Sequence, residues 1–477
     1  MTVYRRPASR GPAGDAIPFG HDGVFHLFHL QSPNGAVHWP ERVRTSWAHA
    51  RSQDLVTWVE LPLAVSPGDP GDCDSDGAWT GSVIAKDGVF HLFYTGHQLG
   101  SETPQTICRA TSDDLVHFTK DRSRPLLAPD TTQYEPGDWR DPFVFWNEEA
   151  GTYWMLIAAR LNSGPKWRRG AVALATSPDL DTWEIAPDPL FVTNTFCPEC
   201  PEMFKLGDRW YLVYSRFSED ARTIYRTATS SRGPWRIPAK ETLDGRRWYA
   251  AKSVAFDEET RVFFGWIHDR EGHTDQGDWL WAGDFAAPRL VTAEVGGGLS
   301  VRLPDAVVSA YSVSTTTSLP PHVVLGSKGS LEYRFFDLKS ERYLFSCAIK
   351  PESDTALFGL LFRMDDDLAG YAFTFDRRRD SAALIRWPQP LDKFWSEFVG
   401  YDEPREVDGP RLVEEQIDLK GASPVECRLI VDESLVELYV NDTIALSYRV
   451  HGRSLHELGL FADDGAIDVA NINLREL

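Results

Sequence analysis

Three acidic residues, Asp15, Asp141 and Glu199, each stand just before an apolar segment typical of a β-strand. Glycosidic cleavage needs one protonated carboxyl group to assist the leaving oxygen, and one ionised carboxylate to attack the anomeric carbon or activate water. A third carboxylate can hydrogen-bond sugar hydroxyls and stabilise the positive charge of the transition state. Each acid alone is equally compatible with a turn at a strand end. Three acids at equivalent positions of a repeat favour a catalytic pocket for a furanose-sized sugar.

Five repeats in the first 300 residues would bring these acids together. Each repeat contains an aromatic-rich apolar strand, and successive strands are 52 to 65 residues apart, which is enough chain for one propeller blade. A polar turn that ends in Trp or Phe follows the first four copies, and long amphipathic helical patterns are absent. The five strand patterns lie at 24–28, 89–94, 153–157, 210–214 and 262–266.

The repeats predict a five-bladed β-propeller in which the innermost strands line a central channel. Residues 10 to 13 positions before the strand markers should then gather at one end of that channel. These residues are Asp15, Trp79, Asp141, Glu199 and Tyr249. Three of the five are carboxylates, so like charges crowd there, and such crowding separates pKa values as acid–base chemistry requires.

The last third of the chain alternates apolar and polar residues with a period of two, which predicts a β-sandwich. A Gly-, Ser-, Thr- and Pro-rich stretch precedes it. The predicted all-β domains are a catalytic propeller at 1–300, a linker at 301–327 and a sandwich at 328–477. The sandwich is expected to pack on the propeller, and a homo-oligomer is left open.

The formal charge of −21 argues against nucleic acid or an anionic membrane as a partner, because a phosphate-binding surface needs clustered Lys and Arg. Neither a secretory signal nor an apolar run long enough to span a bilayer is evident, so a cytoplasmic location is expected. Six scattered cysteines suit reduced thiols. Cys197 and Cys200 form a CxxC pair without a second ligand pair or a βαβ context, so neither a metal nor a cofactor is expected.

Two motifs resemble those of glycoside hydrolase family 32, the invertase, inulinase and levanase family. Arg140-Asp141-Pro142 is similar to its Arg-Asp-Pro motif, and Glu199-Cys200 to its Glu-Cys motif. The resemblance implies a propeller followed by a sandwich, with Asp141 as transition-state stabiliser and Glu199 as acid/base. Further similar segments lie at 47–50, 79–82, 249–251 and 431–441.

The sequence departs from the family around its nucleophile. The family has Asn-Asp-Pro-Asn-Gly where this chain reads Ala-Gly-Asp-Ala-Ile-Pro at 13–18, so that only Asp15 matches. The family's Gln after the first strand falls on Leu30, with Gln31 one place later, and Lys252 stands where Gln is usual. The resemblance implies a retaining mechanism with Asp15 as nucleophile.

The predicted substrate is a small oligosaccharide, sucrose or a short fructo-oligosaccharide, which loses its terminal β-D-fructofuranosyl residue to water or to a second sugar. The alternatives are an inverting arabinofuranosidase or xylosidase similar to glycoside hydrolase family 43, and a carbohydrate-binding protein without catalysis. Glu202 is a rival acid/base with a better fit to a supporting role. The predicted sugar contacts are Arg140, Trp79, Thr80, Trp47, Tyr249, Glu202 and Trp39.

Overall fold

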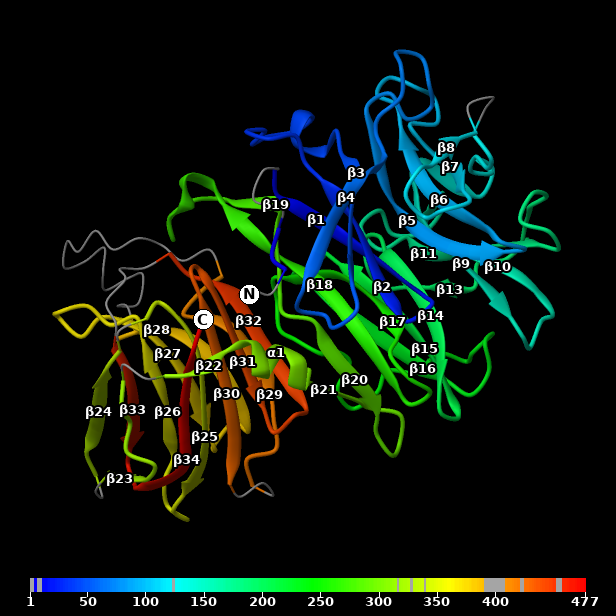
Figure 1. The fold of residues 1–477 in the computed structure, drawn as a ribbon. Coiled ribbons are helices and arrows are strands. Elements are labelled where there is room, and N and C mark those ends of the chain that lie inside the picture. The colour runs from blue at the N-terminus through cyan, green and yellow to red at the C-terminus, as the bar shows by residue number, and fades with distance from the viewer. Residues whose placement is uncertain are drawn as a thin grey trace, which may run out of the picture.

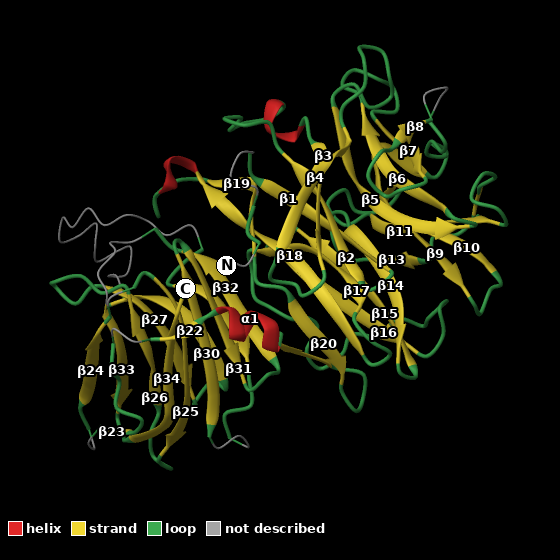
Figure 2. Cartoon of the chain, in the orientation of Figure 1, coloured by secondary structure: helices red, strands yellow, loops and turns green. Residues whose placement is uncertain are grey.

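The computed structural model describes residues 4–6, 11–121, 125–314, 317–326, 329–338, 340–389, 408–420, 424–451 and 457–477. Strands make up almost all of its regular structure (Figure 2). The N-terminal part, blue to green in Figure 1, is a propeller, and the yellow-to-red C-terminal part is a sandwich beside it. This is the all-β architecture that the sequence predicts. No helix of the described residues is long and apolar enough to cross a membrane.

The first four blades are antiparallel sheets whose strands follow chain order. Blade 1 holds β1 (Ala13–His21), β2 (Val24–Gln31), β3 (Ser46–Ser52) and β4 (Trp58–Val65), with a short 3-10 helix at Glu41–Val43. Blade 2 holds β5 (Gly77–Lys86), β6 (Val89–His97), β7 (Gln105–Ser112) and β8 (Thr119–Lys120). Blade 3 holds β9 (Tyr134–Asn147), β10 (Thr152–Leu161), β11 (Gly170–Ser177), β12 (Glu184–Ile185) and β13 (Phe191–Val192). Blade 4 holds β14 (Glu199–Leu206), β15 (Arg209–Arg216) and β16 (Arg222–Ala228).

Blade 5 closes the propeller against blade 1. Its β19 pairs with β18 and meets β1 at Ala13 opposite Gly283, so that the first and last blades share one sheet. Closure of this kind fixes the blades around one channel and leaves only short sheet edges. Blade 5 holds β17 (Trp248–Ala255), β18 (Thr260–Arg270), β19 (Trp279–Phe285), β20 (Arg289–Ala293) and β21 (Leu299–Arg302), with a 3-10 helix at Glu271–His273.

A repeated turn explains the polar element that follows the first three strand patterns. In blade 1, Ser52 Oγ accepts the Leu55 N–H at 2.9 Å and Asp54 Oδ1 accepts the Val56 N–H at 2.9 Å. Leu55 adopts a φ of 66°, and its carbonyl accepts the Trp58 indole N–H at 3.0 Å. Blade 3 repeats the same bonds around Ser177, Asp179 and Trp183. Ser and Asp thus satisfy the turn backbone, as these side chains commonly do.

The sandwich consists of two antiparallel sheets that enclose one large apolar core. One sheet contains β22 (Ser312–Val313), β23 (Val323–Leu325), β25 (Arg342–Pro351), β30 (Val425–Asp432), β31 (Leu435–Val440), β32 (Ile444–Arg449) and β34 (Ile467–Glu476). The other contains β24 (Leu331–Asp337), β26 (Leu357–Phe362), β27 (Gly370–Asp376), β28 (Ser381–Trp387), β29 (Arg411–Gln416) and β33 (Glu457–Asp463).

The connection between the domains is shorter than the predicted linker at 301–327. β21 is still part of blade 5, and the helix α1 (Asp305–Ala310) follows it directly. β22 and β23 both pair with β34, the last strand of the sandwich. The Ser- and Thr-rich composition of the stretch therefore gave no signal for these two short strands, which pair with β34.

The two domains share a buried junction. Leu344, Ile430 and Tyr439 of the sandwich pack in one apolar cluster with Tyr211 and Phe263 of the propeller. Burial of this apolar area supplies the main attraction between the domains. The junction makes the propeller and the sandwich one body, with the sandwich on the outer side of blades 4 and 5.

Arg289 places a positive charge inside this junction. Its fully buried guanidinium contacts Asp244 at 2.6 Å, donates to Ser447 Oγ at 2.7 Å, and lies 4.1 Å from the centre of the Trp248 ring. Glu437 of the sandwich lies 3.8 Å away. A buried charge of this kind is tolerated only while its partners stay in place.

We predict that Arg289→Ala lowers the free energy of unfolding by about 3–5 kcal/mol, because it leaves the buried Asp244 carboxylate without its cation. Denaturant unfolding followed by tryptophan fluorescence measures the effect. Arg428→Ala is the matched control, because the side chains of Arg428 and its partner Asp442 are 39% and 41% exposed. An unfolding curve of Arg289→Ala that overlies that of the control would contradict a stabilising role for this charge.

Candidate active site

The innermost strands of all five blades carry a β-bulge at the same place. In β1 the pairing with β2 shifts between Ala13 and Ala16. In β9 the shift lies between Arg140 and Phe143, and in β14 it lies between Glu199 and Glu202. β5 and β17 have equivalent shifts at 79–81 and 249–252. An extra residue bends the strand and redirects its side chains. Asp15 and Asp141 lie within their bulges, and Glu199 stands directly before its own.

Asp141 joins blades 2, 3 and 4. Its backbone N–H donates to Thr95 Oγ1 at 2.8 Å, and its Oδ2 accepts the Cys200 N–H at 2.8 Å. Asp141 and Cys200 have φ angles of 59° and 51°, in a region that residues other than glycine rarely adopt. Such backbone strain persists only where surrounding contacts hold it, and it clusters at functional sites. The bond to Cys200 fixes Asp141 beside the backbone that carries Glu199.

Glu199 is the most accessible of the three acids, with a side chain 23% exposed. Its Oε1 accepts a bond from Arg140 Nη2 at 2.9 Å, and its Oε2 accepts a bond from the Tyr249 hydroxyl. Burial and the charge of Asp141 raise the pKa of Glu199 above its ordinary value, although Arg140 and Tyr249 act in the opposite direction. The carboxyl group is therefore held in place by two donors and retains its proton more readily than an ordinary glutamate.

Asp15 is buried in β1 of blade 1, with 8% of the residue exposed. Its Oδ1 accepts the indole N–H of Trp266 at 3.0 Å. Burial, followed by the charges of Asp141 and Glu199, raises the pKa of Asp15 to about 7. The Trp266 bond and the charge of Lys252 oppose this rise. The charges of Asp141 and Glu199 thus both act on the pKa of Asp15, which puts the nucleophile candidate in the same electrostatic environment as the other two acids.

Lys252 supplies a buried positive charge behind Asp15. Its side chain leaves β17 and donates from Nζ to the carbonyl of Gly81 on β5 at 2.8 Å. β5 and β17 are the inner strands on either side of β1, so the lysine side chain passes across the channel next to the strand that carries Asp15. A buried ammonium ion in this position favours ionised carboxylates near it.

Arg140 organises the other side of the site. Besides Glu199, its guanidinium contacts Asp138 at 2.6 Å and Gln105 Oε1 at 3.2 Å, and it lies 3.9 Å from Asp141. The planar guanidinium has five fixed donors, so these contacts define its orientation. Arg140 therefore positions Glu199 and balances part of the negative charge of the cluster.

Comparison with known families identifies the chain. The model described as "Glycosyl hydrolases family 32 N-terminal domain" matches residues 16–301, and "Glycosyl hydrolases family 32 C terminal" matches residues 311–476. The chain belongs to glycoside hydrolase family 32. It is therefore a glycoside hydrolase, as its motifs predict.

Known relatives agree with the family. Sucrose-6-phosphate hydrolase of Escherichia coli is 27% identical, and the match covers 92% of this chain and 87% of that protein. An insoluble β-fructofuranosidase isoenzyme of Arabidopsis thaliana is 28% identical over 60% of this chain and 54% of its own length.

Solved structures show the same fold. Fructan 1-exohydrolase IIa from Cichorium intybus has a TM-score of 0.77 at 18% sequence identity. The match covers 100% of this chain and 97% of the exohydrolase chain. Exo-inulinase from Aspergillus awamori has a TM-score of 0.76, also at 18% identity, with 100% and 98% coverage.

Within the family 32 fold, three of the predicted sugar contacts are sealed off from solvent. Trp47 is fully buried and donates its indole N–H to the Trp79 carbonyl at 2.9 Å, and Thr80 is fully buried beside it. Glu202 is also fully buried, where it accepts the Ser253 N–H at 2.6 Å and contacts Arg261 at 3.3 Å. The prediction that these three side chains touch sugar therefore needs correction: they support the strands from behind. Glu202 likewise lacks the access that an acid/base needs.

Of the remaining predicted contacts, Trp79 and Trp39 reach solvent, whereas Arg140 and Tyr249 are buried. Trp79 is partly buried and stacks on His97 with ring centres 4.1 Å apart, and the Trp39 ring, 59% exposed, meets the edge of the same histidine at 5.7 Å. Tyr249 and Arg140 both hold Glu199. Trp39, Trp79 and His97 therefore form an aromatic part of the rim over blades 1 and 2.

The sequence prediction missed residues whose role depends on neighbouring blades. Lys252 was noted only as a departure from the family pattern, and Trp266, which donates to Asp15, lies 251 positions further along the chain. Asp138 stands next to the Arg-Asp-Pro motif but carries no repeat signal of its own. A charge at a position that is usually Gln was the available signal for Lys252.

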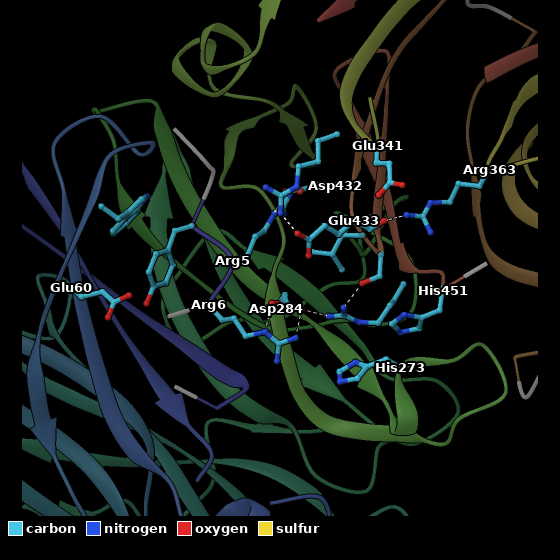
Figure 3. Close-up of a pocket in the computed structure, with 16 residues that line it drawn as sticks. Arg5, Arg6, Glu60, His273, Asp284, Glu341, Arg363, Asp432, Glu433 and His451 are labelled. Atoms are coloured by element: carbon cyan, nitrogen blue, oxygen red, sulfur yellow. Dashed lines mark hydrogen bonds and ion pairs between the residues drawn. The ribbon is translucent and has the colours of Figure 1, made fainter. Parts of the chain in front are cut away.

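A separate cavity of about 840 Å³ lies at the junction of the domains, and none of the three carboxylates lines it. Figure 3 shows Arg5, Arg6 and Asp284 from the propeller side facing Asp432 and Glu433 of the sandwich. Arg5 pairs with Asp432 at 2.9 Å, and Arg6 pairs with Asp284 at 2.6 Å. Acidic residues thus neutralise these arginines. Because its lining comes from both domains, the cavity is part of the domain junction.

Proposed function

We propose that this family 32 member is a retaining β-fructofuranosidase that releases terminal fructosyl residues from sucrose or short fructo-oligosaccharides. The convergence of Asp15, Asp141 and Glu199 at one channel mouth carries the proposal. Family 32 membership and the names of the relatives, which include sucrose-6-phosphate hydrolase, β-fructofuranosidase and fructan exohydrolase, support it. Family 43-like inversion is not favoured, because the family 32 models match both domains.

In this mechanism Asp15 is the nucleophile. Trp266 holds Oδ1, which leaves Oδ2 to attack the anomeric carbon. Glu199 donates its proton to the glycosidic oxygen as the bond to the leaving group breaks, and a covalent fructosyl–Asp15 ester forms. Glu199 then takes a proton from water, and the water oxygen displaces Asp15 from the anomeric carbon. A second sugar in place of water would give fructosyl transfer by the same steps.

Asp141 is the proposed transition-state stabiliser. Its Oδ2 already accepts the Cys200 N–H, so Oδ1 is the oxygen for a sugar hydroxyl. A carboxylate fixed near the developing oxocarbenium charge stabilises it without reorganisation. The backbone of Asp141 has a positive φ, and its N–H donates to Thr95 Oγ1. Both features suit a residue that is held in one position.

The proton distribution follows from the crowding of charge. The active form has one proton on Glu199 and none on Asp15. A proton on Glu199 removes one of the charges that raise the pKa of Asp15, so it favours ionisation of the nucleophile. Lys252 and Trp266 add to this effect from behind Asp15.

The location of the protein is also a proposal. None of the six cysteines forms a disulfide bond in the structure, as is typical of proteins in a reducing compartment. We therefore propose a cytoplasmic location. Cell fractionation with an antibody against the protein tests it, and recovery in the culture medium would argue against it.

We predict that the purified protein releases fructose from sucrose and that Asp15→Asn lowers kcat on the order of 10⁴-fold, because the amide cannot form the ester. Product chromatography with sucrose, sucrose 6-phosphate, inulin and levan oligosaccharides and aryl arabinofuranosides is the measurement. Asp87→Asn, in an exposed hairpin turn, is the matched control and should retain full activity. Release of arabinose alone would move the protein to the alternative specificity, and binding without turnover would make it a carbohydrate-binding protein.

A retaining mechanism predicts that the first product is β-D-fructofuranose. Proton and carbon NMR of the earliest product, before mutarotation, distinguishes the two outcomes. Appearance of the α-anomer first would show inversion, with water rather than Asp15 as the attacking group.

The acidic limb of the activity profile should lie below about pH 7, because protonated Asp15 cannot attack and the proton on Glu199 removes one of the charges that raise the pKa of Asp15. Lys252→Gln removes a charge that lowers the pKa of Asp15, so it should move this acidic limb of kcat/KM upward by about one pH unit. Lys86→Gln, on the surface beside Asp87, is the control and should leave the limb in place. An unshifted limb in Lys252→Gln would show that this lysine does not act on the nucleophile.

A further inference from the structure

An exposed aromatic cluster, Trp167, Phe196 and Phe217, lies at the rim between blades 3 and 4. The Phe196 ring centre is 5.8 Å from that of Trp167 and 5.4 Å from that of Phe217. Trp167 is 68% exposed and Phe217 43% exposed. Neighbouring large rings left this open to solvent commonly mark a binding surface.

The cluster lies at the carboxylate end of the propeller. Trp167 is in the connection from β10 to β11, and the flanking residues Arg160 and Gly170 are opposite each other. Phe196 precedes β14 by three residues, and Phe217 follows β15 at the point where Ser215 is opposite Glu199. All three rings therefore come from segments that surround the backbone of Glu199.

A series of contacts connects Glu199 to these rings. Arg140 contacts both Glu199, at 2.9 Å, and Asp138, at 2.6 Å. Asp138 lies 3.4 Å from Arg160, whose guanidinium stacks 3.7 Å from the centre of the Phe196 ring and donates to the Phe196 carbonyl at 2.8 Å. This series fixes the orientation of Phe196 relative to the acid.

We propose that Trp167, Phe196 and Phe217 form the subsite for the leaving group of the substrate. The inference rests on the proposed function, in which Glu199 protonates the glycosidic oxygen and so must lie on the leaving-group side. A leaving group with an apolar ring face, such as a pyranose, can stack on aromatic rings beside that oxygen. The fructosyl unit itself lies deeper, among the three carboxylates.

Contacts within the protein leave much of the Trp167 and Phe217 rings uncovered. Trp167 contacts Phe196 and the ammonium group of Lys166, and most of its surface is open to water. Trp146 offers a comparison within the same blade: it is 46% exposed and packs edge-on against Tyr153 in the β9–β10 hairpin, at the opposite end of the strands. It is therefore a matched tryptophan far from the proposed subsite.

The test compares two substrates with the same fructosyl unit and different leaving groups, namely sucrose and methyl β-D-fructofuranoside. Trp167→Ala and Phe217→Ala should each lower kcat/KM for sucrose by about five- to tenfold, chiefly through a higher KM, because a stacking surface is lost. For the methyl fructoside, whose leaving group has no ring, kcat/KM should change less than about twofold.

Trp146→Ala should leave both substrates unaffected, and circular dichroism shows whether each variant is folded. An equal loss for both substrates, or no loss for sucrose, would overturn the subsite. Absence of turnover of both substrates by the wild-type protein would instead refute the proposed function on which the inference rests.

Discussion

The crowding of three carboxylates at one end of a closed channel is the constraint on which the site depends. Like charges held close in a buried position repel one another, and burial adds to the free-energy cost of ionising them. The fold offsets this cost with Arg140 beside Glu199 and Lys252 behind Asp15. The same repulsion makes a shared proton useful, because it favours one protonated and one ionised acid at neutral pH.

The bulges of the inner strands turn a structural repeat into an asymmetric site. Five bulges occupy equivalent places, yet only three bring acids to the channel mouth. The bond from the Cys200 N–H to Asp141 links blades 3 and 4, and Trp266 of blade 5 donates to Asp15 of blade 1. Contacts between blades, rather than within one, therefore set the geometry of the acids.

The sandwich acts on this geometry from a distance. Its apolar contacts and the buried charge of Arg289 attach it to the outside of blades 4 and 5, and β19 of blade 5 pairs with β1. A domain attached there packs against blade 5, which carries Tyr249, Lys252 and Trp266. The cavity at the junction belongs to this attachment, since its arginines are paired with acids from both domains.

Sequence alone determined the repeat, the all-β class and the family resemblance, and it indicated the three candidate acids, because strand periodicity and short motifs are local properties of the chain. It overestimated the linker and assigned sugar contacts to Trp47, Thr80 and Glu202, since burial depends on what packs against a side chain from elsewhere. Only the tertiary structure decided that Lys252 reaches Gly81 and that Trp266 reaches Asp15. These partners are far apart in sequence, and only propeller closure brings them together.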